Sequence, residues 1–210
     1  MSNKINLEVL FQSHPVIAIL RGLTTDITKD VGALLYAGGI RAIEVPLNRP
    51  AAMECIRILL DSLPDDCLVG AGTVTTIEQV NKLHDMGATL VVSPNMSETV
   101  IELALGFEMH VFPGISSPTE AFAAYQAGAR WLKLFPATSY GIIHLKALKS
   151  VLPTDVHIMA VGGINPDNIG EWTSAGVAGF GIGSDLFREG DGIDDVKQKL
   201  EKLNRAIFVK

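Results

Sequence analysis

Residues Met109 to Ala137 read MHVFPGISSPTEAFAAYQAGARWLKLFPA and contain one complete unit of the fold. The apolar run from Met109 to Ile115 has the composition of a buried strand. It is followed by Ser117-Pro118-Thr119-Glu120, a capping box with proline at the first helical position, which predicts the start of a helix. A second apolar run, from Arg130 to Ala137, completes a predicted strand–helix–strand unit.

The same unit recurs along the chain, because short runs rich in Val, Ile and Leu alternate with segments of helical period. The predicted strands are Pro15 to Gly22, Ile40 to Asn48, Cys67 to Val74, Ala88 to Asn95, Met109 to Ile115, Arg130 to Ala137, His157 to Ile164 and Ala178 to Asp185. Eight strands with intervening helices favour an α/β fold, a single-domain (β/α)8 TIM barrel, over an open doubly wound sheet. We expect a short N-terminal helical segment at residues 1–14 and the barrel at residues 15–210.

Helix boundaries carry further signals. Thr76 to Gln79 repeats the capping box, and Asn165-Pro166 repeats the cap and the proline. Four glycines, each a few residues before a predicted strand, are typical of the left-handed residue that ends a helix: Gly38, Gly87, Gly128 and Gly176. They recur about every two strand–helix units, which indicates a weak internal repeat.

Composition excludes several classes of protein. Of the 210 residues 48% are hydrophobic and 19% are charged, and the net charge is −6 with no cluster of Lys and Arg, which argues against nucleic acid or an anionic membrane as partner. Cys55 and Cys67 are too few for a disulfide framework, and residues 1–6 do not resemble a signal peptide. We therefore expect a cytoplasmic protein without a membrane span.

Two charged residues lie inside strands that otherwise read as buried. Lys133 is in the middle of Trp131 to Pro136, and Glu44 is in Ala42 to Asn48. An ammonium is costly to bury unless it is paired or its pKa is depressed, which is the setting that a Schiff-base lysine needs. Strand alternation places both side chains inside the barrel, where they can meet. The alternative interpretation is a buried ion pair that only stabilises the barrel.

Further polar groups fall at the carboxyl ends of the strands, where barrels of this kind place their working residues. Arg21 could bind a substrate carboxylate or simply cap a strand. Thr73, in Gly70-Ala71-Gly72-Thr73-Val74, adds a hydroxyl where small neighbours leave room for a ligand. The other candidates at this end are Asn48, Pro94, Pro113 and Phe135.

Two glycine-rich loops follow the seventh and eighth strands. These are Val161-Gly162-Gly163-Ile164 and Gly181-Ile182-Gly183-Ser184-Asp185. Glycines let a phosphate approach backbone N–H groups, and these two loops are where TIM barrels bind phosphate. They predict a phosphate site, although tight turns alone are the simpler alternative. The five histidines form no cluster of ligands, so no metal or other cofactor is expected.

Together these residues resemble the pyruvate-dependent, Schiff-base KDPG and KHG aldolases, which cleave 2-keto-3-deoxy-6-phospho-sugar acids. The resemblance extends from Pro15 to about Phe187. It is carried by Ile43-Glu44-Val45, Gly70 to Val74, Ser93-Pro94-Asn95, Phe112-Pro113-Gly114, Lys133 to Ala137 and Gly162-Gly163-Ile164.

Two branches of this family are similar to the sequence. Pro46, Asn48 and Val161 stand where the phosphogluconate branch has threonine, arginine and threonine, and the first strand ends at Arg21-Gly22. This pattern is similar to the phosphogalactonate branch, in which the arginine of the first strand takes over the substrate carboxylate. The resemblance implies Lys133 and Glu44 as catalytic residues, a phosphorylated keto acid and pyruvate as small-molecule partners, and a homotrimer.

The same resemblance implies a division of the binding residues. Arg21 and Thr73 hold the carboxylate, and Gly162, Gly163 and Ser184 hold the phosphate. The pocket wall consists of Pro94, Pro113 and Phe135, and the remaining candidate binding positions are Asn48, Val161 and Gly183. A phosphogluconate or 4-hydroxy-2-oxoglutarate aldolase, another phosphate-handling barrel enzyme such as an isomerase, and a non-catalytic barrel that binds a phosphorylated ligand stay open as alternatives.

Overall fold

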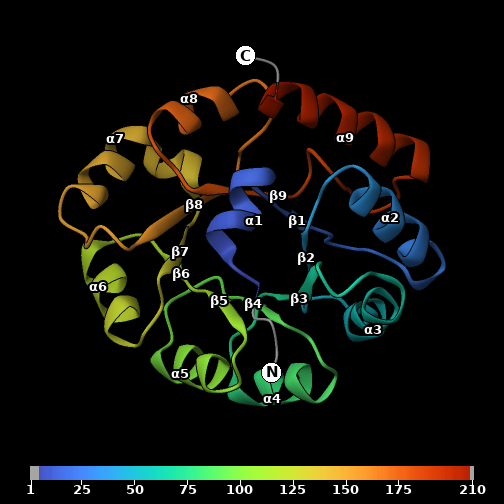
Figure 1. Cartoon of the computed structure of the whole chain (residues 1–210), viewed down its shortest axis with the longest axis horizontal. Coiled ribbons are helices and arrows are strands. Elements are labelled where there is room, and N and C mark those ends of the chain that lie inside the picture. The colour runs from blue at the N-terminus through green and yellow to red at the C-terminus, as the bar shows by residue number, and fades with distance from the viewer. Residues whose placement is uncertain (1–4, 209–210) are drawn as a thin grey trace.

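The computed structural model of the protein describes residues 5–208. The protein is a ring of parallel strands surrounded by helices (Figure 1). The strands are β1 (Val16–Ile19), β2 (Ala42–Pro46), β3 (Leu68–Gly72), β4 (Leu90–Val92), β5 (His110–Phe112), β6 (Gly114–Ile115), β7 (Trp131–Leu134), β8 (His157–Val161) and β9 (Gly179–Ile182). The helices are α1 (Leu7–Ser13), α2 (Thr25–Ala37), α3 (Ala52–Ser62), α4 (Ile77–Asp85), α5 (Glu98–Gly106), α6 (Pro118–Gln126), α7 (Ala137–Lys149), α8 (Ile169–Ser174) and α9 (Ile193–Phe208). The predicted α/β barrel is confirmed.

The fifth predicted strand is divided in two at Pro113. The sheet order is β5-β4-β3-β2-β1-β9-β8-β7-β6, so β5 pairs with β4 on one side and β6 pairs with β7 on the other. Proline has no N–H to donate, but its carbonyl accepts a hydrogen bond of 2.8 Å from the Lys133 N–H. The run from 110 to 115 therefore joins the two edges of the sheet and nearly closes the barrel.

Helix α1 covers the amino-terminal end of the barrel. The centroid of the Phe11 side chain lies 5.0 Å from that of Trp131 and 6.0 Å from that of Phe112. In Figure 1, α1 lies inside the circle of strands. The barrel interior is therefore filled at this end by aromatic side chains. Residues 1–4 of the predicted segment 1–14 lie outside the described residues, and the division of the chain at residue 14 stays a prediction.

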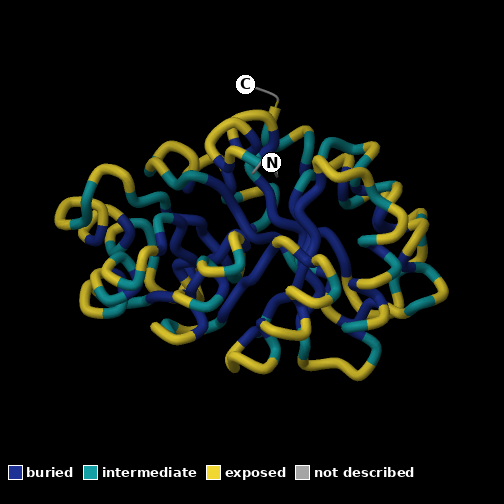
Figure 2. Tube along the Cα trace, turned by 60° about the horizontal axis from the view of Figure 1, so that its bottom comes forward, coloured by how far each residue is buried: buried dark blue, intermediate teal, exposed yellow. Residues whose placement is uncertain are grey.

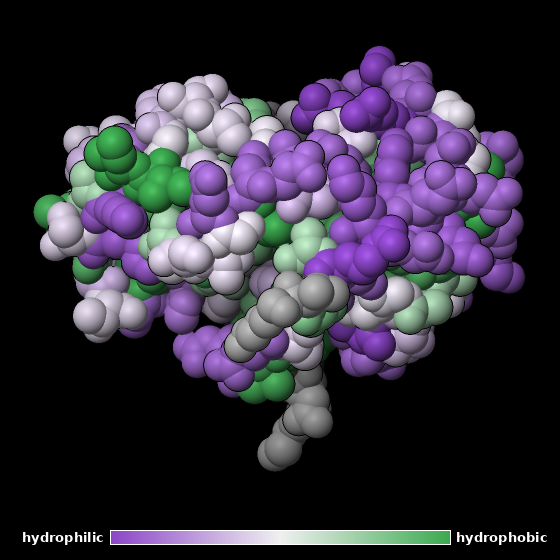
Figure 3. Space-filling view, turned by 90° about the horizontal axis from the view of Figure 1, so that it is seen from above, coloured by the Kyte–Doolittle hydropathy of each residue, from purple (hydrophilic) through white to green (hydrophobic). Residues whose placement is uncertain are grey.

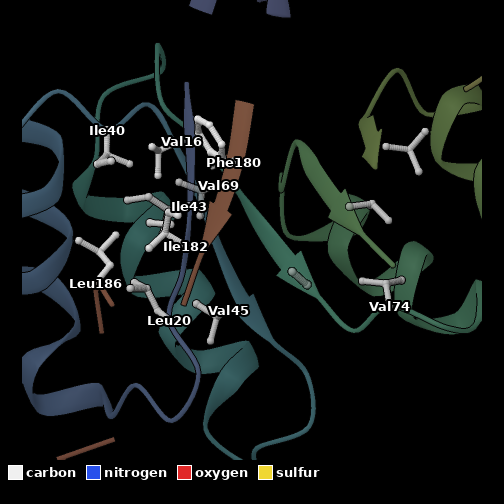
Figure 4. Close-up of a cluster of buried hydrophobic side chains, with 14 of the residues drawn as sticks. Val16, Leu20, Ile40, Ile43, Val45, Val69, Val74, Phe180, Ile182 and Leu186 are labelled. Carbon is white, nitrogen blue, oxygen red and sulfur yellow. The ribbon is translucent and has the colours of Figure 1, made fainter. Parts of the chain in front are cut away.

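The main core lies between the strands and the surrounding helices. Figure 4 shows part of it, where Val16 and Ile43 from the strands meet Ile40 and Leu186, and the strands form the buried centre of the molecule in Figure 2. Helix α9 packs one face on this core and exposes a charged face, which contributes to the hydrophilic surface in Figure 3. Within residues 5–208, no helix is both long and apolar enough to cross a bilayer.

Most of the predicted helix boundaries are confirmed. Both capping boxes form, at Thr76 with Gln79 and at Ser117 with Glu120. Two expectations were wrong. The left-handed glycine after α2 is Gly39, with φ of 99°, because Gly38 is the C-cap of the helix and has φ of −79°. Asn165 caps a separate turn that precedes α8, since its side chain accepts hydrogen bonds from the N–H groups of residues 167 and 168.

The two halves of the barrel repeat each other in detail. Arg41 lies over the ring of Tyr36 and pairs with Asp66, and an arginine, a tyrosine and an aspartate with the same spacing do so in the second half: Arg130, Tyr125 and Asp155. The strand registers match too, since Ile43 pairs with Val69 as Leu132 pairs with Ile158. In this repeat, Glu44 on β2 and Lys133 on β7 hold equivalent positions.

Candidate active site

A cavity of about 410 Å³ opens at the carboxyl ends of the strands. Its wall combines Lys133, Glu44 and both glycine loops with three arginines and two further acidic residues. The lining residues are Ile19, Arg21, Glu44, Arg49, Thr73, Pro94, Lys133, Phe135, Val161, Gly162, Gly163, Ile164, Gly181, Gly183, Ser184, Asp185, Phe187, Arg188 and Glu189.

Lys133 projects into this cavity from β7. It is only 7% exposed, and its neighbours in the sheet are Gly114 and Met159. Its Nζ lies 4.7 Å from the centroid of the Phe135 ring, where the negative face of the ring attracts a cation. The amine is therefore held in a mostly apolar environment with one open side.

Glu44 enters the same cavity from β2 and is 2% exposed. Gly72 of β3 leaves space for the carboxylate in this position, because a Cβ built there would lie 1.8 Å from Glu44 Oε2 and would displace it. This Oε2 makes no hydrogen bond to another described residue, so it can accept one from a bound substrate or water. Glu44 and Lys133 thus share one cavity, as the strand alternation predicts.

Burial decides the protonation of both groups. Desolvation raises the pKa of Glu44 to about 7, although the nearby charges of Lys133 and Arg21 oppose this rise. Desolvation also lowers the pKa of Lys133, and it outweighs the opposing attraction of the Glu44 carboxylate. The sequence left the direction of the Lys133 shift open, and the packing of the barrel resolves it towards the neutral amine.

Left-handed backbone is found both at Thr73 and in the glycine loop after β8. Thr73, directly after β3, has φ of 59°, which is strained for a β-branched residue. Gly162 and Gly163 have φ of 98° and 77°, conformations that glycine adopts without strain. A Cβ at Gly163 would also lie 2.2 Å from Thr138 Oγ1, so bare backbone is needed there.

Of the residues predicted from sequence, two do not line the cavity. Asn48 is exposed and lies in a neighbouring surface pocket with Leu47 and Pro50, because the chain turns outward after β2. Pro113 is buried in the strand run, where its carbonyl bonds to the Lys133 backbone. The other predicted residues come together in one cavity, which includes Arg21, Glu44, Thr73, Pro94, Lys133, Phe135, Val161, Gly162, Gly163, Gly183 and Ser184.

Sequence reasoning missed several charged residues of the wall, namely Arg49, Asp185, Arg188 and Glu189. Arg49 pairs with Glu189 at 2.9 Å and so links the loop after β2 to the loop after β9. The sequence could have identified Arg49 and Glu189 as candidates, because both residues follow strands at the same end of the barrel as Arg21. Among residues 5–208, no three His, Cys, Asp or Glu side chains are grouped so that they could hold a metal ion.

A family model described as KDPG and KHG aldolase matches residues 7–202. The chain belongs to the KDPG and KHG aldolase family. Aldolases are lyases, so the enzyme class predicted from sequence is confirmed along with the family. The chain is 46% identical over 197 residues to the 2-dehydro-3-deoxy-6-phosphogalactonate aldolase of Escherichia coli K12, covering 93% of each chain.

Solved structures of the family have the same fold. A structure described as native KDPGal has a TM-score of 0.89 at 44% identity and covers 92% of this chain and 94% of its own. The KDPG aldolase of Legionella pneumophila, with pyruvate captured as a covalent carbinolamine, has a TM-score of 0.84 at 30% identity, covering 95% and 97%. The fold and the family of this aldolase are thus established together.

Proposed function

We propose that this aldolase cleaves 2-dehydro-3-deoxy-6-phosphogalactonate into pyruvate and glyceraldehyde 3-phosphate through an imine on Lys133. The observation that carries the proposal is the buried Lys133, with its lowered pKa, in one cavity with Glu44, whose pKa is raised to about 7. A neutral amine is the nucleophile that the reaction needs, and a carboxyl that titrates near neutral pH serves as both acid and base.

The reaction begins when the neutral Lys133 amine attacks the C2 ketone. Loss of water from the resulting carbinolamine leaves a protonated imine, which withdraws electrons from the C3–C4 bond. Removal of the C4 hydroxyl proton then breaks this bond, and the electron pair passes into the imine as an enamine. Glyceraldehyde 3-phosphate leaves, the enamine carbon gains a proton, and hydrolysis of the imine releases pyruvate and regenerates the amine.

Glu44 is the proton carrier in each of these steps. As a neutral acid it supplies the proton that the departing water needs, and as a carboxylate it takes the C4 hydroxyl proton. It then returns this proton to the enamine carbon. The free Oε2 and a pKa near 7 support this double role, because both protonation states are populated at neutral pH.

The substrate-binding roles follow the positions in the cavity. Arg21, close enough to change the pKa of both catalytic groups, binds the carboxylate next to C2, together with Thr73. The glycine loop at Gly162 and Gly163, with Ser184, binds the phosphate at the far end of the substrate.

The choice of the galactonate epimer rests on two observations. The chain is 46% identical to the phosphogalactonate aldolase but 30% identical to the Legionella KDPG aldolase. Val161, an apolar residue where the phosphogluconate branch has a threonine, lines the cavity beside the phosphate loop. We therefore place the phosphogluconate epimer second. Comparing kcat/KM for the two epimeric phosphates tests this, and a preference for the gluconate substrate would reverse it.

Borohydride trapping tests the chemistry itself. Incubation with pyruvate and borohydride should add one reduced pyruvyl group, and peptide mapping should place it on Lys133. Lys133→Ala should abolish both trapping and turnover. An unchanged mass of the intact protein would favour a non-catalytic barrel that binds a phosphorylated ligand, and near-normal turnover of Lys133→Ala would exclude the proposed mechanism.

We also propose that the enzyme is a homotrimer, as the family resemblance implies. Helix α7 supports this, because Ile143 is 88% exposed and Tyr140 is also exposed in the single chain. Green hydrophobic atoms gather on the side of Figure 3 where α7 lies. For the compartment we propose the cytoplasm, since Cys55 and Cys67 are both buried and free.

A further inference from the structure

The cavity holds more charge than the proposed reaction uses. Its cationic side chains are Arg21, Arg49, Lys133 and Arg188, and its acidic side chains are Glu44, Asp185 and Glu189. Arg49 is neutralised by its ion pair with Glu189, and Lys133 faces Glu44. Within residues 5–208, Arg21 and Arg188 are the cavity arginines that form no ion pair with a carboxylate.

Arg188 is held in place although its side chain is exposed. Its Nε donates a hydrogen bond of 2.9 Å to the Ser184 carbonyl, and its backbone N–H donates one of 2.7 Å to Asp191 Oδ2. Asp191 is in turn paired with Lys199 on α9. The guanidinium is thus oriented through Nε, and its two Nη groups form no hydrogen bond with another described residue.

The loop that carries Arg188 is also anchored from across the cavity. Glu189 pairs with Arg49 from the loop after β2, and its side chain packs on Gly22, where an added Cβ would lie 2.8 Å from Glu189 Cβ. Side chains on both sides of the mouth therefore fix the backbone at Arg188. A fixed guanidinium loses little freedom when it binds an anion.

We propose that Arg188 binds the substrate phosphate and makes this aldolase selective for phosphorylated over unphosphorylated keto acids. This inference rests on the proposed function and adds to it a residue that discriminates between substrates. The guanidinium shares the cavity with Gly162, Gly163 and Ser184, and it is pinned to the Ser184 carbonyl, so it lies on the phosphate side. A planar guanidinium with two free Nη groups matches two phosphate oxygens.

The two arginines differ in the carboxyl and amine groups on which their charges act. Arg21 influences the pKa of both Glu44 and Lys133, whereas the charge of Arg188 acts on Asp191, in the loop that leads to α9. The substrate carboxylate adjoins the carbon that bonds to Lys133, and the phosphate is at the other end of the molecule. Arg21 therefore suits the carboxylate, and Arg188 suits the phosphate.

The negative charge of Asp185 is a further argument that Arg188 binds the phosphate. Asp185 lines the same part of the cavity and accepts a long hydrogen bond of 3.4 Å from Ser184 Oγ. A carboxylate beside a phosphate dianion repels it, and backbone N–H groups alone carry no full positive charge. The Arg188 guanidinium adds a full positive charge to the lining of this cavity.

The test compares one substrate with and without its phosphate. We expect Arg188→Ala to lower kcat/KM for 2-dehydro-3-deoxy-6-phosphogalactonate roughly 10- to 100-fold, the value of a lost charge-assisted contact. For the analogue without the 6-phosphate, kcat/KM should change by less than about twofold. Arg188→Lys, which keeps the charge, should recover part of the loss, and inorganic phosphate should inhibit Arg188→Ala less than the wild type.

The matched control is Arg57→Ala, an exposed arginine on α3 outside the cavity, which should leave both substrates unaffected. If Arg188→Ala folds poorly, Arg188→Gln is measured in its place. An unchanged preference for the phosphorylated substrate, or an equal loss with both substrates, would overturn the proposal. Trapping of pyruvate on Lys133 involves no phosphate, so its success would keep the proposed function intact even if Arg188 failed this test.

Discussion

The barrel removes two charged residues, Lys133 and Glu44, from water. Burial favours the neutral form of each, so the pKa of Glu44 rises to about 7 and the pKa of Lys133 falls. Their mutual attraction opposes both shifts but does not cancel them. The result is an amine that can act as a nucleophile next to a carboxyl that can exchange protons.

Glu44→Gln should change how stability depends on pH. The carboxyl titrates near 4.5 in the unfolded chain and at about 7 in the folded protein, so between these values the folded state holds a proton that the unfolded state has lost. Rising pH therefore destabilises the wild type, by on the order of 3 kcal/mol across this window. In Glu44→Gln this fall should disappear, as measured by denaturant unfolding at a series of pH values.

The control for this measurement is Glu54→Gln, an exposed glutamate on α3, which should keep the wild-type profile. Lys133 acts in the opposite direction. Because its folded pKa is lowered, its contribution to stability increases as pH rises towards 10.5, the ordinary value. A Glu44→Gln protein that loses as much stability as the wild type between pH 4.5 and 7 would contradict the assignment.

At the scale of the elements, β3 makes room for the Glu44 carboxylate. Gly72 lies where any side chain would overlap Glu44, and Thr73 turns the chain with a left-handed φ directly afterwards. The strand therefore ends in a residue without a side chain followed by a strained turn. The space left by the missing Gly72 side chain holds the Glu44 carboxylate, which lines the cavity.

Gly72→Ala should inactivate the enzyme without unfolding it. The added Cβ would lie 1.8 Å from Glu44 Oε2, so the carboxylate must move away from the reacting atoms. A misplacement of this size costs on the order of 100-fold in kcat. The measurement is kcat for cleavage, together with unfolding to establish that the fold persists.

Gly170→Ala on α8 provides the comparison for this substitution. Its added Cβ would meet no atom within 4 Å, so kcat should be unchanged. Alanine is also the better helix former, and stability should rise by about 0.5–1 kcal/mol. Wild-type turnover in Gly72→Ala would mean that Glu44 does not need its observed position.

At the scale of the whole molecule, the internal repeat explains why Glu44 and Lys133 share one cavity. Each half contributes its second strand, β2 or β7, and each of these strands places one ionisable residue at the equivalent inward position. The glycine intervals in the sequence already indicated a repeat of this kind. An approximate twofold arrangement of the halves brings Glu44 and Lys133 to the same level of one cavity.

The proposed trimer makes a prediction at this scale as well. Ile143→Glu puts a charge on the exposed apolar part of α7, and burying that charge between subunits would cost more than the contact gains. We expect this variant to elute as a smaller species, as measured by light scattering. Val9→Glu, on the exposed face of α1, should keep the wild-type mass, and a full-size Ile143→Glu assembly would place the interface elsewhere.

Much of this protein could be read from its sequence alone. Alternating apolar runs and helix caps specified the barrel, because periodicity and capping are local properties of the chain. Lys133 and Glu44 stood out because a charge within a buried strand is costly and therefore calls for an explanation. The glycine loops after the last two strands predicted a phosphate site, because the residue types that suit a phosphate can also be recognised locally.

The tertiary structure alone decided the rest. It divided the fifth strand at Pro113, turned Asn48 out of the cavity and brought Arg49 and Arg188 into it. It also determined that the pKa of Lys133 is lowered and not raised. Each of these outcomes depends on distances and solvent exclusion between segments far apart in the chain, and no local pattern of residues encodes such quantities.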